Sequence, residues 1–479
     1  MKAKEQYIVK INLPGGIISA GNLLRVLKVL QELGIETVSF GNRQQLLFSA
    51  ATEHLHHLRL NIPNTIMEVN GDDYPNIVSS YVTEEVFAPI GWLREGVYKD
   101  ILDSFNYHPR LKINIVDRHQ NLIPFFTGNF NFISSDISNH WYLHVRFPKT
   151  NKIYPWPSLI YSADIAEISR LLELIIMDND HLFYNKPNAD GDQLVQMLNR
   201  MADFHTQYYD LPMTHTDFHL PFYEGINYYG EHKLWLGIYR RWENFFVDFL
   251  IEICTLCMDC RIGQLYTTPW KTILIKNILP SYRIRWSVLL NKYRINVRHA
   301  SNELNWQLED RSDEAKELKW LLVKAFEEAD LRTSKLCFAI KISKQTGLFG
   351  SIIIQKEISE ETLYHVMHTS NFNPNSKEFV NYGSAGDIKE LGELLIRLCN
   401  VYYEMHSTLR LSVTPKKEVN SKKNDAPAQI YQCKHCFTRY DPLYGDSINS
   451  ISPGTSFDLL VDYNCPTCDA RKAEFERVF

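Results

Sequence analysis

The sequence predicts an α+β fold in which one α/β unit occurs twice, followed by a small metal-binding fold at the C-terminus. Strand and helix patterns alternate through residues 1–411, part of that pattern repeats at a fixed offset, and four of the nine cysteines fall in the last 50 residues. A chain of 479 residues is too long for a single hydrophobic core, so several domains are expected.

A gapless offset of 227 residues reveals the repeat. Residues 7–50 lie over residues 234–277, and both segments follow the order strand, helix, strand, strand. In each copy the first strand is apolar, the helix carries apolar residues at i, i+3, i+4 and i+7, and a glycine and a strand pair follow. Two related half-domains are therefore expected.

A second matching pattern follows each half-domain. Residues 111–116 (LKINIV) precede 141–145 (WYLHV), and residues 336–342 (LCFAIKI) precede 350–354 (GSIII). The body of the chain is thus predicted to be a duplicated pair of α/β units. The predicted domains are half-domains at 1–70 and 221–295, an α/β lobe after each at 71–220 and 296–411, a flexible linker at 412–428 and the metal fold at 429–479.

Three strings carry a resemblance over residues 5–400. LPGG after the first strand, the RQQLLF strand and the TTPWKTILI strand resemble the ferredoxin-like half-domains of the sirohaem nitrite and sulfite reductases. The implied fold is a pair of ferredoxin-like α/β half-domains with associated lobes. The same resemblance implies a 4Fe-4S cluster that shares a cysteine with the sirohaem iron and is held by a CxxxxxC and a CxxxC pair, since thiolates suit cluster iron.

The segments that should supply those thiolates contain no cysteine. They are residues 76–88, 296–305 and 342–347. Neither the cluster nor sirohaem is therefore expected, and no catalytic residue is transferred from the family. If the body nevertheless binds sirohaem, the basic residues Arg43, Lys112, Arg118 and Lys271 are candidates to meet its carboxylates, although surface charge is the favoured role of each.

A CxxCxxC run at Cys254, Cys257 and Cys260 resembles that of bacterial ferredoxins. Under the 227-residue offset these cysteines align with leucines of the first predicted helix, so we favour a buried helix face over a cluster. The remaining body thiols, Cys337 and Cys399, lack the proline that usually follows a fourth ligand.

Histidines gather in two places without a metal-binding pattern. No HExxH motif is present, and surface or packed positions are favoured over metal binding. The residues concerned are His54, His56, His57, His215 and His219. No dinucleotide, P-loop or GxSxG motif is found in recognisable context either.

The strongest chemical signal is a pair of CxxC motifs in the tail, separated by 28 residues, 437–464. Two such motifs can supply four thiolates to one tetrahedral metal, either iron or zinc. The four predicted ligands are Cys433, Cys436, Cys465 and Cys468.

The strings between the motifs, YDPLYGD and PGTSF, resemble those of rubredoxins across the whole tail. The resemblance implies one iron ion cycling between ferric and ferrous states. It also implies a small aromatic core beneath the metal, made here by Tyr431, Tyr440, Phe457, Tyr463 and Phe475. The sequence departs from the family at Phe437 and Asp469, where a glycine with positive φ is usual after each motif, and at Tyr463, where tryptophan is usual.

Composition limits the possible partners. A net charge of -5 and a pI of about 6.4 give no basic surface for nucleic acid. We find no signal peptide or apolar stretch long enough for a membrane span, and an odd number of cysteines grouped as CxxC suits a reducing cytoplasm.

The sequence therefore predicts a one-electron carrier rather than a reductase. In this interpretation the body is a docking scaffold that presents the iron centre to a redox protein. The family resemblance of the body suggests a nitrite or sulfite reductase as that partner. Two alternatives stay open: an active sirohaem-type reductase with non-standard ligands, and a zinc-stabilised interaction module.

Overall fold

The computed structural model forms two compact units, Met1–Ser407, called the body here, and Thr408–Phe479, called the tail. The predicted linker at 412–428 lies outside the described residues. The structure describes residues 6–62, 67–83, 85–87, 91–209, 213, 217–230, 232–343, 347–358, 362–411, 429–446, 448–449 and 451–478.

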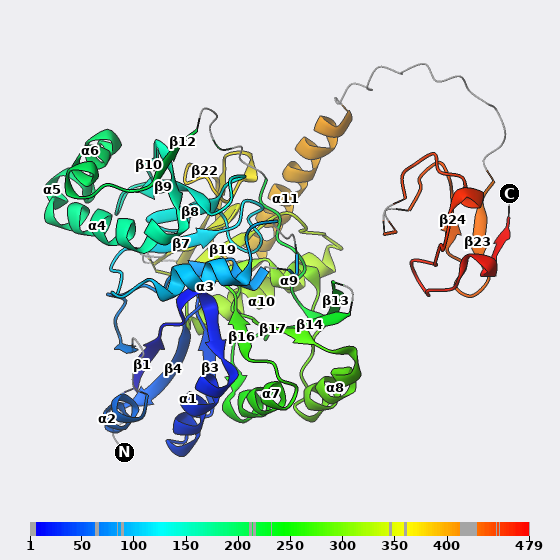
Figure 1. The fold of residues 1–479 in the computed structure, drawn as a ribbon, viewed down its shortest axis with the longest axis horizontal. Helices are drawn as coiled ribbons and strands as arrows, with labels where there is room; N and C mark the ends of the chain where they lie inside the picture. The colour runs from blue at the N-terminus through cyan, green and yellow to red at the C-terminus, as the bar shows by residue number, and fades with distance from the viewer. Residues whose placement is uncertain are drawn as a thin grey trace. The chain divides into compact units, whose positions relative to one another are not determined.

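The two half-domains repeat element for element. The first contains β1 (Gln6–Ile11), α1 (Ala20–Glu32), β3 (Thr37–Phe40) and β4 (Leu46–Ala51). The second contains β14 (Lys233–Ile238), α7 (Val247–Asp259), β16 (Gln264–Thr267) and β17 (Ile273–Ile278). Every boundary in the second copy lies 227 residues after its counterpart, for example 233 against 6. The predicted duplication and α+β class are confirmed (Figure 1).

The half-domains exchange a short strand. β2 (Ile17–Ser19) leaves its own sheet and pairs with β16, while β15 (Phe245–Phe246) pairs with β3. The turn that starts this exchange requires glycine, because Gly16 has a φ of 72° and a Cβ there would lie 2.8 Å from the carbonyl oxygen of Thr267. The LPGG string therefore allows one half-domain to reach the other.

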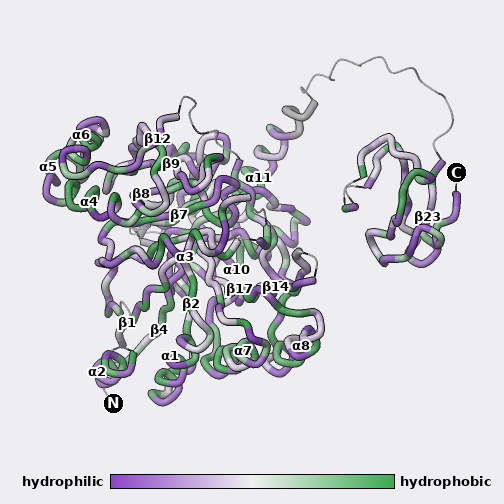
Figure 2. Tube along the Cα trace, viewed as in Figure 1, coloured by the Kyte–Doolittle hydropathy of each residue, from purple (hydrophilic) through white to green (hydrophobic). Residues whose placement is uncertain are grey.

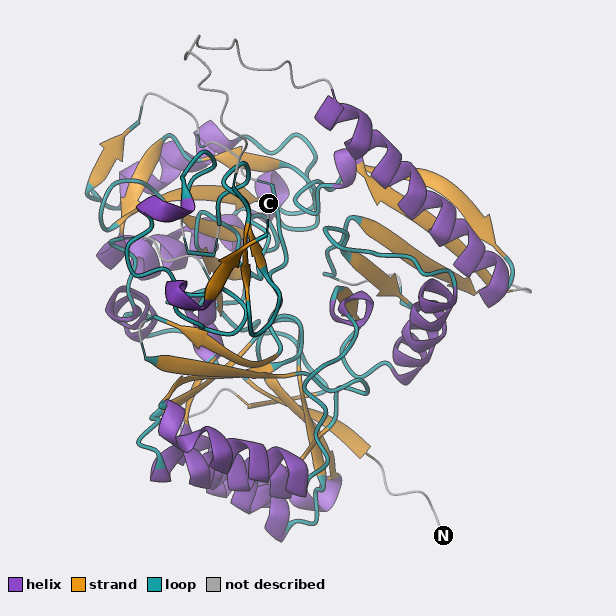
Figure 3. Cartoon of the chain, turned by 90° about the vertical axis from the view of Figure 1, so that its right-hand side faces the viewer, coloured by secondary structure: helices purple, strands orange, loops and turns teal. Residues whose placement is uncertain are grey.

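One hydrophobic cluster spans both half-domains. Leu27 and Leu30 of α1 lie in the same cluster as Ile253, Cys254 and Cys257 of α7, and all five side chains are fully buried. Burial of a leucine-sized side chain contributes about 1.5–3 kcal/mol. Figure 3 shows helices gathered beneath the strands of this region, and Figure 2 shows hydrophobic and hydrophilic residues together along α1 and α7, as expected for helices with one buried face.

The two lobes also share one topology. In each, three parallel strands are followed by two antiparallel ones. The first lobe contains β6 (Val78–Ser79), α3 (Glu95–Asp103), β7 (Ile113–Val116), β8 (Phe130–Ser134), β9 (His140–Arg146), β11 (Ser158–Tyr161) and α4 (Ile165–Asp178). The second contains β18 (Trp306–Leu308), α10 (Asp313–Glu328), β19 (Phe338–Lys341), β20 (Ile352–Ile358), β21 (Thr362–Thr369), β22 (Phe379–Ala385) and α11 (Ile388–Leu411).

The strand correspondence predicted for the lobes was wrong by one strand. The sequence matched residues 141–145 with 350–354, but β9 is antiparallel to β8, whereas β20 is parallel to β19. The counterpart of β20 is β8, which the sequence did not predict. All five residues of β8 are buried, so it lacks the alternation of period two by which a half-buried strand is found.

Smaller elements complete the body. They are α2 (Thr52–Asn61), β5 (Met67–Val69), β10 (Ile153–Pro155), α5 (Asp180–Phe183), α6 (Gly191–Met201), β12 (Thr206–Tyr208), β13 (Gly225–Tyr229), α8 (Arg283–Lys292) and α9 (Ser301–Leu304). None of the helices in the described ranges combines the length and the apolar character that crossing a bilayer requires.

The tail is a three-stranded sheet with an aromatic core. Its order is β24 (Arg439–Tyr440), β23 (Tyr431–Cys433) and β25 (Phe475–Arg477). Tyr431 stacks on Phe457 with ring centroids 4.2 Å apart, and Phe457 also contacts the other three aromatic rings. The predicted five-residue aromatic core is confirmed.

Candidate metal centre

The four cysteines of the tail converge on one point. Their Sγ atoms all lie within 4.8 Å of one another, with 3.6 Å between Cys433 and Cys468 and 3.4 Å between Cys436 and Cys465. A tetrahedral metal with bonds of about 2.3 Å to sulfur would place its ligands about 3.8 Å apart. The site therefore fits one tetrahedral ion.

Matching backbone turns bring the sulfurs together. In the first CxxC knuckle (residues 433–438), the Phe437 amide donates to the Cys433 carbonyl and the Cys433 amide to the Thr438 carbonyl, both at 2.9 Å. In the second knuckle (residues 465–470), the Asp469 amide donates to the Cys465 carbonyl at 2.9 Å, and the Cys465 amide to the Ala470 carbonyl at 2.8 Å. The two knuckles are thus near copies.

Each turn closes through a left-handed residue that is not glycine. Phe437 has a φ of 61° and Asp469 a φ of 59°. This conformation suits glycine and, less well, aspartate, while for a bulky residue it costs about 1–2 kcal/mol. The Phe437 side chain is 69% exposed, so burial does not offset that cost.

Exposure divides the four sulfurs into two pairs. Cys433 and Cys465, the first cysteine of each knuckle, are completely buried above the aromatic core. Cys436 is half-buried and Cys468 is exposed. The second cysteines thus form an edge at which an electron can enter or leave.

The thiol of Cys436 has a polar neighbour. The hydroxyl Oγ1 of Thr438 lies 3.1 Å from the Cys436 Sγ. This hydroxyl, together with the Thr438 backbone amide, lowers the pKa of the Cys436 thiol to about 6. A group that holds the thiolate form also favours metal binding, because the thiolate is the ligand.

The loop between the knuckles is held by the YGD string. Tyr463 donates a hydrogen bond from its hydroxyl to Asp446 at 2.9 Å, which links the aromatic core to the loop. Gly445 has a φ of 68°, and a Cβ there would lie 2.4 Å from the carbonyl oxygen of Ile451. Only glycine therefore fits this turn.

The body cysteines form no comparable group. Cys254 and Cys257 are fully buried on α7, where burial raises the pKa of the Cys254 thiol to about 12, and Cys260 lies at the end of that helix. Burial likewise raises the pKa of the Cys337 and Cys399 thiols. Across the described ranges, only the tail brings three or more ligand-type side chains together for a metal. A buried thiol with a raised pKa is a poor ligand.

The histidines named from the sequence do not converge either. His54, His56 and His57 all lie on α2, where His54 is 3.6 Å from Glu53 and His57 is 3.9 Å from Glu32. His219 is exposed, and His215 lies outside the described residues.

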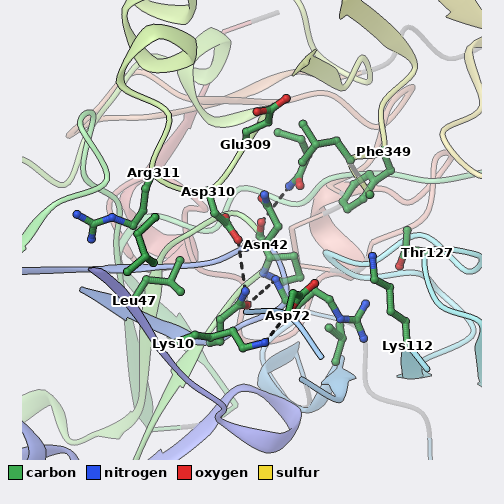
Figure 4. Close-up of a pocket in the computed structure, with 18 of the residues that line it drawn as sticks. Lys10, Asn42, Leu47, Asp72, Lys112, Thr127, Glu309, Asp310, Arg311 and Phe349 are labelled. Carbon is green, nitrogen blue, oxygen red and sulfur yellow. Dashed lines mark hydrogen bonds and ion pairs between the residues drawn. The ribbon is translucent and has the colours of Figure 1, made fainter. Parts of the chain in front are cut away.

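A cavity of about 610 Å³ lies in the body between the first half-domain and both lobes. Side chains from distant parts of the chain face it, among them Lys10, Asn42, Asp72, Lys112 and Asp310 (Figure 4). The buried atoms Oδ1 of Asn42 and Oε1 of Gln307 accept no hydrogen bond within the described residues. The cavity is therefore polar and incompletely satisfied.

Three of the four basic residues proposed for sirohaem carboxylates are engaged internally. Arg43 lines the cavity, but its Nη2 donates to the carbonyls of Asn76 at 2.7 Å and Ile113 at 3.0 Å. Lys271 is buried in an ion pair with Glu243 at 2.8 Å, and Arg118 is paired with Asp136.

Lys112 differs from these three. It lines the cavity beside Gly347, and no ion pair or hydrogen bond of its ammonium is present in the described part of the chain. Burial and the nearby Arg43 lower its pKa to about 8.

The resemblance found in the sequence implies sirohaem and a 4Fe-4S cluster, and the cavity does not fit that pair. No thiol is present among its described lining residues, whereas such a cluster needs thiolate ligands. Its other lysine, Lys10, is paired with Glu68 and lies 2.8 Å from Asp72.

Two features of these sites were not predicted. In the sequence, Thr438 is only a threonine two residues after a predicted ligand. That its hydroxyl lies beside Cys436 follows from the shape of the turn, which the sequence alone does not give. The cavity combines residues from β1, the β3–β4 turn, the start of β7 and the end of β18, so no local string marks it.

Known proteins resemble the two units separately. A NirA protein from Mycobacterium tuberculosis has a similar structure, with a TM-score of 0.62 and 12% identity over 87% of this chain and 82% of that one. At this identity the likeness concerns the fold. It agrees with the fold predicted for the body.

The tail resembles rubredoxins in sequence. The rubredoxin family profile matches residues 430–475. Probable rubredoxin HupJ of Rhodobacter capsulatus is 51% identical over 47 residues, which are 10% of this chain and 17% of that protein. The high molecular weight rubredoxin of Moorella thermoacetica is 49% identical over 49 residues, 10% of this chain and 21% of that protein.

Shorter relatives are covered more fully. Probable rubredoxin HupI of Rhizobium leguminosarum is 44% identical over 48 residues, which are 10% of this chain and 69% of that protein. The chain thus spans about a fifth of the first two relatives and about two thirds of the third. Through residues 430–475, the chain belongs to the rubredoxin family.

Proposed function

We propose that this protein carries single electrons through one iron ion bound by Cys433, Cys436, Cys465 and Cys468. The observation that carries the proposal is the convergence of four sulfurs in a rubredoxin-type tail with two of them at the surface. Iron bound there would change between the ferric and ferrous states, taking one electron from a reduced donor and passing it to an oxidised acceptor.

The surrounding residues support transfer without chemistry on a substrate. All four positions are taken by protein thiolates, so none is left open for substrate. The aromatic core keeps water from the buried sulfurs of Cys433 and Cys465. The edge made by Cys436 and Cys468 shortens the path to a docked partner. The chain's own residues therefore hold the ion, exclude water and expose one side.

For the body we propose a docking scaffold derived from a reductase. It has the fold found in NirA, but its described cavity residues include no thiol. The composition of residues 412–428 predicts a coil with an end-to-end distance of about 20–25 Å, long enough for the tail to reach a partner held by the body. By fold, the partner we propose is a nitrite or sulfite reductase.

The domain division and the compartment belong to the same proposal. The proposed domains are the half-domains at 1–70 and 221–295, the lobes at 71–220 and 296–411, the linker at 412–428 and the electron carrier at 429–479. Five buried, unpaired thiols in the body suit a reducing cytoplasm.

A visible spectrum with a metal assay tests the function. Purified full-length protein should contain one iron per chain and show broad ferric-thiolate bands that dithionite bleaches. A colourless protein with one zinc per chain would instead establish the zinc-stabilised module.

A second candidate is a body that binds an anionic cofactor such as sirohaem in this cavity without a 4Fe-4S cluster. The ammonium of Lys112, which lines the cavity without an ion pair or hydrogen bond in the described part of the chain, supports it. A sirohaem absorption band in the purified protein, lost in K112M, would establish this candidate and contradict the scaffold.

A further inference from the structure

The two metal-binding knuckles match in backbone but differ in one side chain. Thr438 and Ala470 occupy the same place, two residues after the second cysteine of each motif, and each carbonyl accepts from the first cysteine's amide. Their backbone amides also act alike, on the sulfurs of Cys436 and Cys468 respectively. The Thr438 hydroxyl is the difference, so the second knuckle serves as an internal control.

The hydroxyl of Thr438 connects sulfur to the opposite knuckle. Its Oγ1 lies 3.1 Å from the Cys436 Sγ and 2.8 Å from Oγ1 of Thr467. A metal-bound thiolate can only accept, so the Thr438 hydroxyl must be the donor to it, and Thr467 Oγ1 is a second acceptor within reach of the same hydroxyl. Thr438 is half-buried and Thr467 exposed, so this chain of two hydroxyls runs from the surface to one ligand.

A donor placed this way acts unequally on the two redox states. Adding an electron to the centre increases the negative charge on the four sulfurs. A hydrogen bond to an acceptor strengthens as the acceptor becomes more negative, so the hydroxyl stabilises the reduced state more than the oxidised one. Thr467 Oγ1 accepts from the same hydroxyl, so it competes with the sulfur for that proton and weakens the effect.

We propose that Thr438 raises the midpoint potential of the tail by donating a hydrogen bond to Cys436, which makes Cys436 and Cys468 unequal electron-transfer edges. Thr438 is a positioning residue, since it acts through the ligand. The inference rests on the proposed one-electron function and names the side chain that tunes it.

Voltammetry of the full-length, iron-loaded chain tests the proposal. T438V removes the hydroxyl while keeping the shape, and its midpoint potential should be lower than that of the parent. T438S keeps a hydroxyl and should stay near the parent, and T467V, which removes the competing acceptor, should not lower the potential. A470S adds a hydroxyl at the matching place of the second knuckle and should raise the potential.

T455V is the matched control in the same unit. The Thr455 hydroxyl donates to the Ser452 carbonyl at 2.7 Å, away from the sulfurs, so its loss should leave the potential unchanged. Equal potentials for the parent, T438V and T438S would overturn the inference. An equal decrease in T438V and T438S would overturn it too, because only packing could then be responsible.

Cobalt separates failure of this inference from failure of the proposed function. In the Co(II)-loaded chain, loss of a hydrogen bond to sulfur raises the sulfur lone-pair energy, so the charge-transfer band of T438V should move to longer wavelength than in the parent and T438S. A parent without a reversible one-electron wave would overturn the function and the tuning of its potential together. A wave with an unmoved potential and an unmoved cobalt band would overturn only the inference.

Discussion

The body and the tail use the same residue in opposite ways. Cys254 and Cys257 on α7 and Cys260 at its C-terminal cap follow one another at intervals of three residues and are buried, which raises the pKa of their thiols. In the tail, cysteines at the same interval sit on turns that close with a positive φ, and four sulfurs meet. Spacing therefore predicts a metal site only when the backbone between the cysteines turns back on itself.

The largest effect is expected from removing a buried ligand. C465A should abolish tight metal binding and unfold the tail, because a unit of this size depends on a metal whose binding contributes on the order of 10 kcal/mol. Metal stoichiometry and proteolysis of the full-length chain measure this. The matched variant is C257A, which should keep one metal per chain and lower the free energy of unfolding of the body by about 1–2 kcal/mol. Loss of metal in C257A would contradict the distinction between the two units.

A buried charge in the body should have the next largest effect. Although burial opposes its charge, Glu243 and Asp310 raise the pKa of Lys271. K271M leaves those two carboxylates without their cation, so we expect a loss of about 3–5 kcal/mol in the free energy of unfolding of the body. Urea unfolding followed by tryptophan fluorescence checks this. The metal content of the tail should not change.

Relief of backbone strain in the tail should increase the stability of the tail, by less than the losses expected above. F437G should stabilise the metal-loaded tail by about 1 kcal/mol, since glycine adopts the left-handed conformation freely. D469G should gain less, because aspartate tolerates that conformation better than phenylalanine does. The rate of metal release to a chelator compares the two. A destabilised F437G would show that the exposed ring has a packing role.

The smallest effect is a change in pH dependence. Lys112 has a folded-state pKa of about 8, below the usual 10.5, so between these values the unfolded chain binds more protons and the stability of the body rises with pH. K112M should reduce that rise, measured by urea unfolding from pH 7.5 to 10.5. K324M, at an exposed position of α10, is the control. An unaltered rise in K112M would show that Lys112 is not the group responsible.

Local patterns predicted the repeat and the four ligands, and failed where the structure depends on distant segments. The 227-residue offset predicted the order strand, helix, strand, strand in both half-domains, because helix and strand periods are local properties. The buried strand β8 has no such period. The exchange of β2 and β15 depends on pairing with residues over 200 positions away, which no local pattern contains.

The same limit applies to the sites. The spacing of Cys433 and Cys436 is enough by itself to predict a metal-binding knuckle. The cavity around Lys112, in contrast, brings Asn42 beside Asp310 only after both lobes have folded. Arg43 and Lys271 show the converse. Surface charge was the role that the sequence favoured for both, but Arg43 donates to backbone carbonyls and Lys271 is paired with a buried carboxylate.

The strand exchange between the half-domains has the geometry of a two-fold symmetric dimer whose subunits have been joined into one chain. Each half completes the sheet of the other, so neither can be removed without leaving an open strand edge. Because the two halves are separate segments of one chain, their sequences can differ, whereas the two subunits of a homodimer have the same sequence. At the matching positions 44 and 271, both with positive φ, one half holds a neutral glutamine and the other a buried lysine, so a symmetric frame carries an asymmetric interior.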